Sequence, residues 1–506
     1  MVFKLQLWPR FRLQAIKYYF VLMLLVLSHS SYGSLLTDAQ SFYESGQYFK
    51  AARYAFAASE ENHSLQPVAY SWITISLIHA GLYHSASYFF IRTLQTADRG
   101  TKQRVLLHTQ DLLVRVGADL FRNYLIRHTT YEDYDASNRS AYLYALGKEA
   151  LLHGKAEKAI GYVNGMSTHS PLWVFALQIR GTAYAILGKN EDALTDFRSC
   201  SDKAPEEDLR SRCIAGEART LYQMDRFNEA DQKYEDVKKS SFVWTDTLFE
   251  QAWTSFAKDE YNRTLGRLVS YKSPLLSFVF NSEIEVLRAQ AYLVLCLYSD
   301  ANEVVNAFNA KYAGLGEEVK RYVEKNPSDL QVFYSLGKTV LKSSLHTQKE
   351  FHKIVNRFVR APYFQNQMAT ESSIKQELQA IHQFDLTQPG VSHNSGQGLP
   401  GFLNLVLSWR QKSVQILGGA FVKNSLIDYH STLISDFEKM AFIKLEMLSR
   451  AKHRLVYKEP SAAERSRGNH IPTRRDDQYY WSFNGEFWND ELGDYIFGLE
   501  SECGKS

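Results

Sequence analysis

Residues 147–205 decide the fold of this chain, because they contain one pattern twice. The first copy begins G-K-E-A-L-L-H-G-K-A-E-K-A-I-G-Y-V, and the second begins G-T-A-Y-A-I-L-G-K-N-E-D-A-L-T-D-F. The shared positions recur 34 residues later: Gly147, Ala150, Gly154, Ala159, Val163 and Pro171 in the first copy, and Gly181, Tyr184, Gly188, Ala193, Phe197 and Pro205 in the second. A tandem repeat of this period predicts stacked helix–turn–helix units.

Each recurring residue type has a packing reason. Gly181 lets the first helix of the unit approach the second, and Gly188 ends the first helix in the left-handed conformation that glycine adopts most easily. Ala193 is small where the helices cross, Phe197 packs toward the next unit, and Pro205 cannot continue a helix. The pattern resembles the tetratricopeptide repeat (TPR), whose units stack into a right-handed superhelix with a concave groove. We therefore expect an all-α TPR solenoid.

The pattern continues on both sides of this stretch. Before it, Gly46, Gly81 and Gly117 mark three N-terminal copies, of which the third is degraded. After it, small residues at 218, 252 and 289 mark three more copies. We expect about eight repeats, arranged as N-terminal TPR-like repeats over 34–127 and a central TPR array over 137–312.

Beyond residue 312 the repeat fades while helical spacing persists. We expect a helical extension over 313–386, a Gly/Pro/Ser-rich linker over 387–400, and a long helical hairpin or arm over 401–457, with a candidate break at Gly418–Gly419. A polar segment over 458–478 is expected to be flexible. The arm carries apolar residues at the spacing of a hairpin or coiled coil: Leu426, Tyr429, Leu433, Phe437, Met440, Ile443 and Met447.

The C-terminal block, residues 479–506, is rich in aromatic and acidic residues and begins Y-Y-W-S-F-N-G-E-F-W-N-D-E. One interpretation is a strand–turn–strand or capping segment that packs its rings on the helical body. The other is a docking motif, in which Trp481 and Trp488 anchor a partner protein or a glycan.

Residues 1–33 resemble a secretory signal peptide. A basic start is followed by the apolar run Y-Y-F-V-L-M-L-L-V-L at 18–27, and small residues predict cleavage after Gly33. The alternative is an uncleaved signal anchor, although the run is short for a membrane span. No later apolar run is long enough to cross a membrane. The expected location is therefore the periplasm, after secretion across the inner membrane.

Four cysteines follow this segment, and an exported compartment permits disulfides. Cys200 and Cys213 flank a hydrophilic turn between helices, which makes them the preferred disulfide, although two buried thiols are the alternative. Cys296 and Cys503 have no assigned partner. No C-x-x-C motif and no Cys/His cluster is present, so we expect no metal site and no cofactor.

A narrower resemblance rests on three segments. They are W-T-S-F-A-K-D-E-Y-N-R from Trp253, E-I-E-V-L-R-A-Q-A from Glu283 and F-N-G-E-F-W-N-D-E from Phe483. Together they resemble periplasmic TPR proteins of the deltaproteobacteria, including those associated with adventurous gliding motility. The resemblance implies a cell-envelope complex, with other envelope proteins as partners.

The chain carries no recognisable catalytic motif: G-x-S-x-G, H-E-x-x-H and the P-loop are all missing. Its formal charge of +3 gives no sign of nucleic-acid binding. We expect a non-enzymatic interaction scaffold without a small-molecule substrate. One alternative is an envelope enzyme, or its regulatory subunit, with a site in the segment from Pro400 onward. Another is an outer-membrane assembly accessory protein, although the cysteine that such proteins use for lipid anchoring is missing.

TPR geometry nominates groove residues on the first helix of a repeat, where an extended peptide or a partner helix would bind. In the best-defined repeats these positions are held by Phe175, Gln178, Arg212, Asp246 and Phe249. The alternative for each is an ordinary solvated residue or a contact between repeats.

Overall fold

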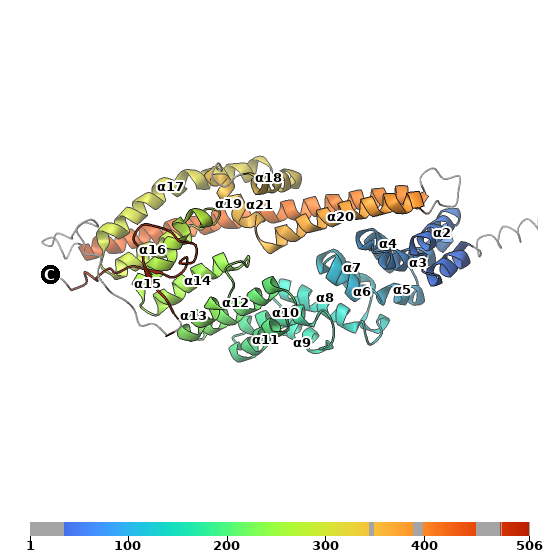
Figure 1. Ribbon diagram of the computed structural model, residues 1–506, viewed down its shortest axis with the longest axis horizontal. Helices are drawn as coiled ribbons and strands as arrows, with labels where there is room; N and C mark the ends of the chain where they lie inside the picture. Colours follow the sequence, from blue (N-terminus) through green and yellow to red (C-terminus); the bar gives the residue numbers. More distant parts are fainter. Residues whose placement is uncertain (1–34, 344–348, 388–397, 452–475, 477, 505–506) are drawn as a thin grey trace, which may run out of the picture. The chain divides into compact units, whose positions relative to one another are not determined.

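The computed structural model describes residues 35–343, 349–387, 398–451, 476 and 478–504 (Figure 1). The expected signal peptide, most of the expected linker and most of the expected flexible segment lie outside the described residues. Within them the secondary structure is helical except for two strands of two residues each. The prediction of an all-α fold is therefore confirmed.

The chain divides into two compact units. Unit 1 consists of the described residues up to 173 together with 370–412, and unit 2 of residues 174–369 together with the described residues from 413 onward. The division falls inside α10 (Trp173–Ile186), α20 (Pro362–Thr387) and α21 (Gly398–Ala451). It does not follow the boundaries expected from the sequence. The boundary expected after residue 312 lies inside a single helix, α17 (Tyr298–Lys325).

Unit 1 is a series of short helices, most of which pack on the next helix in the sequence. A helix over 35–44 precedes α2 (Tyr48–Glu61), η1 (His63–Leu65), α3 (Gln66–His79), α4 (Tyr83–Thr96), α5 (Arg99–Leu106), α6 (Thr109–Arg115), α7 (Ala118–His128), η2 (Tyr131–Asp133), α8 (Arg139–Leu152) and α9 (Ala156–Asn164). Fully buried rings of Phe49, Phe89, Phe90 and Phe121 fill the core between them.

Residues 370–412 complete unit 1 from far along the sequence. The ring of Phe384 stacks on that of Phe49, with centroids 4.8 Å apart. The buried carboxylate of Glu377 accepts hydrogen bonds from the backbone N–H groups of His84 and Ser85, at 2.7 and 2.9 Å. These N–H groups belong to the first turn of α4, which has no intrahelical acceptor for them. Glu377 therefore caps α4 from 293 residues away in sequence.

Unit 2 contains longer helices and the two strands. Its elements after α10 are α11 (Asn190–Lys203), α12 (Glu207–Gln223), α13 (Phe227–Glu235), α14 (Trp244–Ala257), α15 (Tyr261–Val269), η3 (Ser270–Lys272), η4 (Pro274–Leu276), α16 (Glu283–Val294), α17, α18 (Leu330–Lys342), α19 (Glu350–Val359), β1 (Trp481–Ser482) and β2 (Tyr495–Ile496). Neighbouring helices α11 and α12, α12 and α13, α14 and α15, and α16 and α17 pack against each other.

A left-handed residue recurs between the two helices of successive pairs. The five glycines 46, 81, 117, 154 and 188 have φ between 68° and 101°. Further along the chain the same place is taken by Asp225, Asp259 and Cys296, with φ of 57°, 60° and 58°. Aspartate tolerates this conformation better than most residues. The turn between the two helices of a pair is thus retained at Asp225, Asp259 and Cys296, although these positions lack glycine.

Phe197 explains two of the glycines in the repeats. Its ring lies between α10 and α12, and a Cβ added to Gly181 would lie 3.2 Å from it. A Cβ at Gly216 would lie only 2.6 Å from the same ring. The space left by these two glycines is therefore filled by an aromatic side chain of the intervening helix, which ties consecutive helix pairs together.

The helix α21 is continuous through Gly418–Gly419, so the candidate break there was wrong. The two glycines instead permit a close approach of α18. A Cβ at Gly419 would lie 1.9 Å from the carbonyl oxygen of Leu330, and one at Gly418 would lie 2.7 Å from the ring of Tyr334. The apolar residues predicted along the arm form its buried face, with Leu433 against Gly316 and Phe437 against Phe308 of α17.

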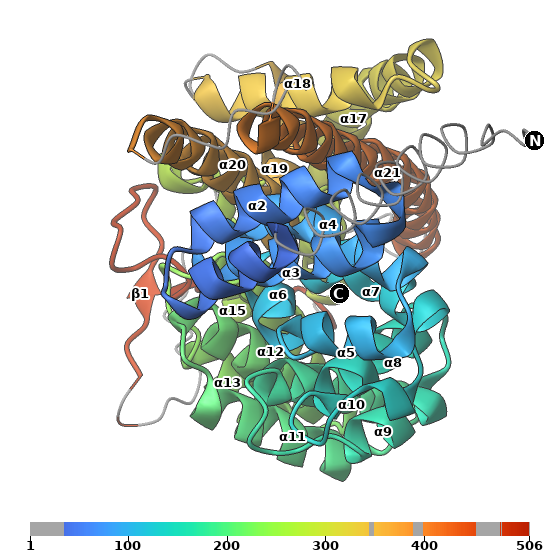
Figure 2. The same cartoon turned by 90° about the vertical axis from the view of Figure 1, so that its right-hand side faces the viewer.

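The C-terminal block packs on α15 (Figure 2). Its strands β1 and β2 pair in parallel, with Trp481 opposite Tyr495. The backbone of β2 lies directly on Gly266, where a Cβ would come within 1.9 Å of the Tyr495 carbonyl oxygen. Asn262 hydrogen-bonds both the N–H and the carbonyl of Leu499, each at 2.9 Å. The block is thus fixed to the helix by its backbone.

Two disulfides join parts of unit 2. The first links Cys200 of α11 to Cys213 of α12 across a sequence separation of 13. The second links Cys296, the left-handed residue before α17, to Cys503 across a separation of 207. It holds the end of the C-terminal block, and Glu502 N–H adds a hydrogen bond to the Leu295 carbonyl at 2.9 Å.

Candidate partner-binding pocket

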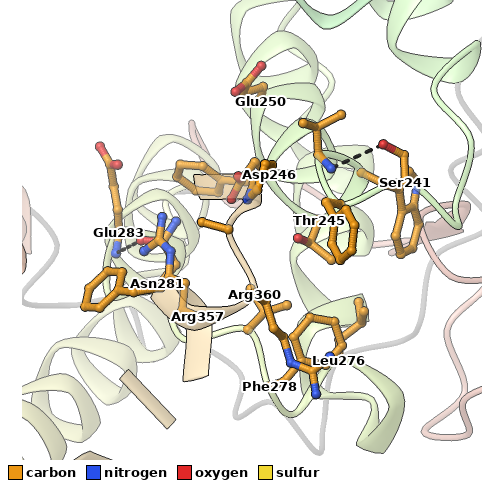
Figure 3. Close-up of a pocket in the computed structure, with 18 of the residues that line it drawn as sticks. Ser241, Thr245, Asp246, Glu250, Leu276, Phe278, Asn281, Glu283, Arg357 and Arg360 are labelled. Carbon is orange, nitrogen blue, oxygen red and sulfur yellow. Dashed lines mark hydrogen bonds between the residues drawn. The ribbon is translucent and has the colours of Figure 1, made fainter. Parts of the chain in front are cut away.

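A pocket of about 1040 Å³ lies within unit 2, and we call it the α14 pocket (Figure 3). Helix α14 and the residues just before it form one side. The segment 275–283, the end of α19 and residues 425–432 of α21 supply the rest, with Arg219 of α12 and Glu283 of α16 at its edge. Elements far apart in the sequence therefore contribute to one cavity.

The α14 side carries two of the residues predicted for the groove. Asp246, Phe249, Glu250 and Trp253 are spaced at three and four residues, which places them on one face of the helix. Asp246 is exposed, while Phe249 and Trp253 are half-buried. Glu250 accepts a forked pair of hydrogen bonds from the guanidinium of Arg219, the shortest at 2.8 Å, so its charge is balanced.

A partly buried tyrosine, Tyr271, holds the first turn of α14 by a hydrogen bond. The hydroxyl of Tyr271 donates to the carbonyl of Thr245, and burial raises the pKa of Tyr271 well above its ordinary value. Because the phenol stays protonated, this hydrogen bond keeps its donor throughout the physiological pH range. The first turn of α14, with Asp246, is thereby held in place at the pocket.

The other side is aromatic and basic. Arg357, on α19, donates to the carbonyl of Phe280 at 3.1 Å. Arg360 follows the helix, donates to Asn356 at 3.2 Å, and lies over the ring of Phe278 at 4.6 Å from its centroid. Burial lowers the pKa of Arg360 from its ordinary value. Figure 3 shows Arg360 and Phe278 on one side of the pocket and Asp246 and Glu250 on the other.

The remaining predicted groove residues do not line this pocket. Gln178 of α10 contacts the disulfide sulfur of Cys213 at 3.7 Å. Arg212 is half-buried and pairs with Asp208 of its own helix at 3.6 Å. Phe175 is half-buried on α10. Of the five nominated positions, the structure therefore brings together only Asp246 and Phe249.

The C-terminal block combines buried and exposed rings. Phe483, Phe487 and Phe497 pack against the core that contains Trp244 and Tyr495. Trp481 and Trp488, which the sequence nominated as anchors, are 46% and 58% exposed on the same block. Lys239 joins the block to the edge of the pocket, because its ammonium donates to the carbonyls of Asp490 and Leu492 at 2.9 Å each.

A buried ionic cluster lies beneath the start of this block. The carboxylate of Asp231 on α13 pairs with Arg263 at 2.8 Å and with Arg267 at 2.7 Å. Burial opposes ionisation of Asp231, but the charges of Arg267 and Arg263 outweigh it and hold its pKa at about 2. The guanidinium of Arg263 in turn lies 4.7 Å from the ring centroid of Tyr480. The ion pairs join α13 to α15, and the contact with Tyr480 adds the start of the C-terminal block.

Sequence reasoning missed the basic and aromatic side of the pocket. Arg357, Phe358 and Arg360 stand in R-F-V-R, a pattern that any helix end with a solvated face also shows. These three residues line the pocket only because a helix that is distant in the sequence lies opposite them. The spacing of residues in the sequence does not predict that contact.

The arrangement of the pocket suits side chains of a protein segment. Half-buried aromatic rings offer apolar contact, and paired and unpaired charges offer orientation. Among the described residues, no group of three or more His, Cys, Asp or Glu side chains has a geometry that could hold a metal ion. Across the same residues, no helix combines the length and the hydropathy of a membrane span.

The chain matches no protein-family model, and no curated protein is significantly similar to it.

Proposed function

We propose that this chain is a non-enzymatic scaffold of the cell envelope, which binds a segment of a partner protein in the α14 pocket. The observation that carries the proposal is the position of Asp246 and Phe249. TPR geometry nominated them as groove residues, and both open into a cavity whose other walls come from α19 and α21.

The recurrence of one turn supports a TPR solenoid of about eight repeats. The left-handed residues between helices run from Gly46 to Cys296 at intervals of 34 to 37 residues. Contacts between α12 and α14, and between α14 and α16, join the first helices of successive pairs, as stacking requires. The concave face of such a stack is the surface on which TPR-like proteins hold extended partners.

The two disulfides support the envelope as the site of action. Disulfides persist in oxidising compartments such as the bacterial periplasm, and all four cysteines are paired in unit 2. With the leader-like residues 1–33, this favours a secreted, periplasmic scaffold among other envelope proteins. A gliding-type machinery is the setting that the sequence resemblance favours.

A site-specific crosslinking experiment tests the proposal. The photoreactive residue p-benzoylphenylalanine replaces Phe249 in the pocket or, as a matched control, Ile186, which is 60% exposed on α10. We expect protein adducts from position 249 and none of the same mass from position 186. The captured protein is then purified, and its affinity is measured by calorimetry. Phe249→Ala should weaken it about tenfold, as expected of a central apolar contact, while Ile186→Ala leaves it unchanged.

Two outcomes would overturn the proposal. One is the same adducts from both positions. The other is an unchanged affinity of the captured protein for the Phe249→Ala variant, provided that thermal unfolding shows this variant to be folded.

A further inference from the structure

Two arginines at the end of α19 face the pocket without an acidic partner among the described residues. Arg357 hydrogen-bonds the Phe280 carbonyl, and Arg360 the amide oxygen of Asn356. Within the described part of the chain, neither forms an ion pair with a carboxylate. The C-terminal end of a helix favours positive charge, which stabilises both guanidinium groups where they are.

Four other charged residues that line the pocket do have a partner of opposite charge. Glu250 is balanced by Arg219, and Glu283 by Lys439 at 3.2 Å. Lys239 lies 3.6 Å from Asp494. The two arginines are thus the cationic groups of the lining whose charge no carboxylate of the described residues balances.

The partial burial of Arg357 and Arg360 makes their positive charge important for ligand binding. Both arginines are half-buried, so a ligand that fills the pocket removes water from them. Desolvating an ion without a counter-charge is costly, whereas a carboxylate can accept paired hydrogen bonds from the guanidinium fork. The pocket therefore favours a ligand that places negative charge beside Arg357 and Arg360.

Apolar surface adjoins the charge. Phe278 lies beneath Arg360, and the ring of Phe358 lies 6.3 Å from that of Tyr429, measured between centroids. Phe249 and Trp253 present half-buried rings from α14. Two exposed carboxylates, Asp246 and Asp428, also line the pocket. They would favour a basic ligand if they, and not the arginines, dominated recognition.

We propose that the partner segment is acidic: it places carboxylates on Arg357 and Arg360 and an aromatic or aliphatic side chain against Phe249 and Phe278. This inference rests on the function proposed above, because it specifies the chemistry of the segment that the α14 pocket binds.

The test uses defined peptides and the full chain. A fluorescein-labelled peptide E-E-F-E-E-L-E-E is titrated by anisotropy, beside its counterpart K-K-F-K-K-L-K-K. We expect the acidic peptide to bind, with an affinity that falls as salt is raised, and the basic peptide not to bind. The double variant Arg357→Gln, Arg360→Gln should bind the acidic peptide about tenfold more weakly, because it lacks both charge-assisted contacts.

Matched variants separate the effect of losing positive charge from an effect on folding. Arg357→Lys with Arg360→Lys keeps the charge and should retain most of the salt dependence. Arg321→Gln makes the same change at an exposed position of α17 outside the pocket and should bind like the unaltered chain. Preferential binding of the basic peptide, weakened by Asp246→Asn, would overturn the inference. Equal affinity of the glutamine and arginine forms would do so as well.

The same variants distinguish this inference from the proposed function. If the protein captured at position 249 binds with an affinity that depends on Phe249 but not on the two arginines, the scaffold stands and the acidic partner is refuted. If position 249 captures nothing specific and no peptide binds, the proposed function itself has failed.

Discussion

The contact between α15 and the C-terminal block predicts a large effect of one methyl group. In Gly266→Ala the added Cβ would lie 1.9 Å from the Tyr495 carbonyl oxygen, 2.4 Å from its carbonyl carbon and 2.7 Å from the Ile496 Cα. All three atoms are backbone, so no side-chain rotation relieves the clash. Reaching an ordinary 3.4 Å contact requires the strand to move by about 1.5 Å.

A shift of this size breaks the hydrogen bonds that fix the block. Three join it to Asn262, through Phe497 N–H and both backbone groups of Leu499. At about 1 kcal/mol each they contribute about 3 kcal/mol, and partial exposure of the buried ring of Tyr495 adds about 1 to 2 kcal/mol. We expect Gly266→Ala to lower the free energy of unfolding by about 4 kcal/mol.

Urea denaturation followed by circular dichroism measures this change. Gly314→Ala is the matched control, because Gly314 is an exposed residue within α17 and an added Cβ meets nothing within 4 Å. That variant should gain about 0.5 to 1 kcal/mol from helix propensity. Hydrogen exchange should also show faster exchange at Phe497 and Leu499 in Gly266→Ala alone. If Gly266→Ala is as stable as the unaltered chain and keeps this protection, the described docking of the block is wrong.

Two further predictions concern the ionic cluster and the disulfides. Asp231→Asn should lower the free energy of unfolding by about 3 to 5 kcal/mol at neutral pH, because the buried Arg267 loses its carboxylate partner and Arg263 keeps only its longer contacts with Glu235 and Glu260, at 3.3 and 3.5 Å. The pKa of Asp231 in the folded state is lowered from 3.8 to about 2, so its stabilising effect is present above pH 4 and is lost between pH 4 and 2. Urea titrations at several pH values should show this loss for the unaltered chain but not for Asp231→Asn. Identical acid profiles of the two proteins would refute this prediction. Opening the Cys296–Cys503 disulfide with serine variants should cost about 5 kcal/mol by loop entropy, against about 3 kcal/mol for Cys200–Cys213, given separations of 207 and 13. The reverse order of denaturation midpoints would contradict that account.

The local rules of the repeat could be predicted from the sequence. Gly154 and Gly188 end their helices in the left-handed conformation, and Ala193 is fully buried at a helix crossing. Asp246 and Phe249, which the repeat period nominated as groove residues, both line the α14 pocket. These predictions depend on residues within one helix pair, where spacing determines the geometry.

Contacts between distant segments could not be predicted in this way. Gly418–Gly419 resembled a helix break, because a close partner such as Leu330 leaves no trace in the local pattern. Gly266 fills a helix position where only the approach of Tyr495 requires glycine. The pairing of Cys296 with Cys503 and the arrival of Arg357 at α14 likewise depend on the path of the chain through space.

The closure of unit 2 by its C-terminal block also has a consequence for the order of folding. Cys503 follows Cys296 by 207 residues, so the chain must be synthesised well beyond α16 before the bond can form. Until then the Gly266 face of α15 and the core around Trp244 lack their cover, and exposed apolar surface of this kind invites aggregation. The covering of this face therefore waits until the C-terminal block has been synthesised.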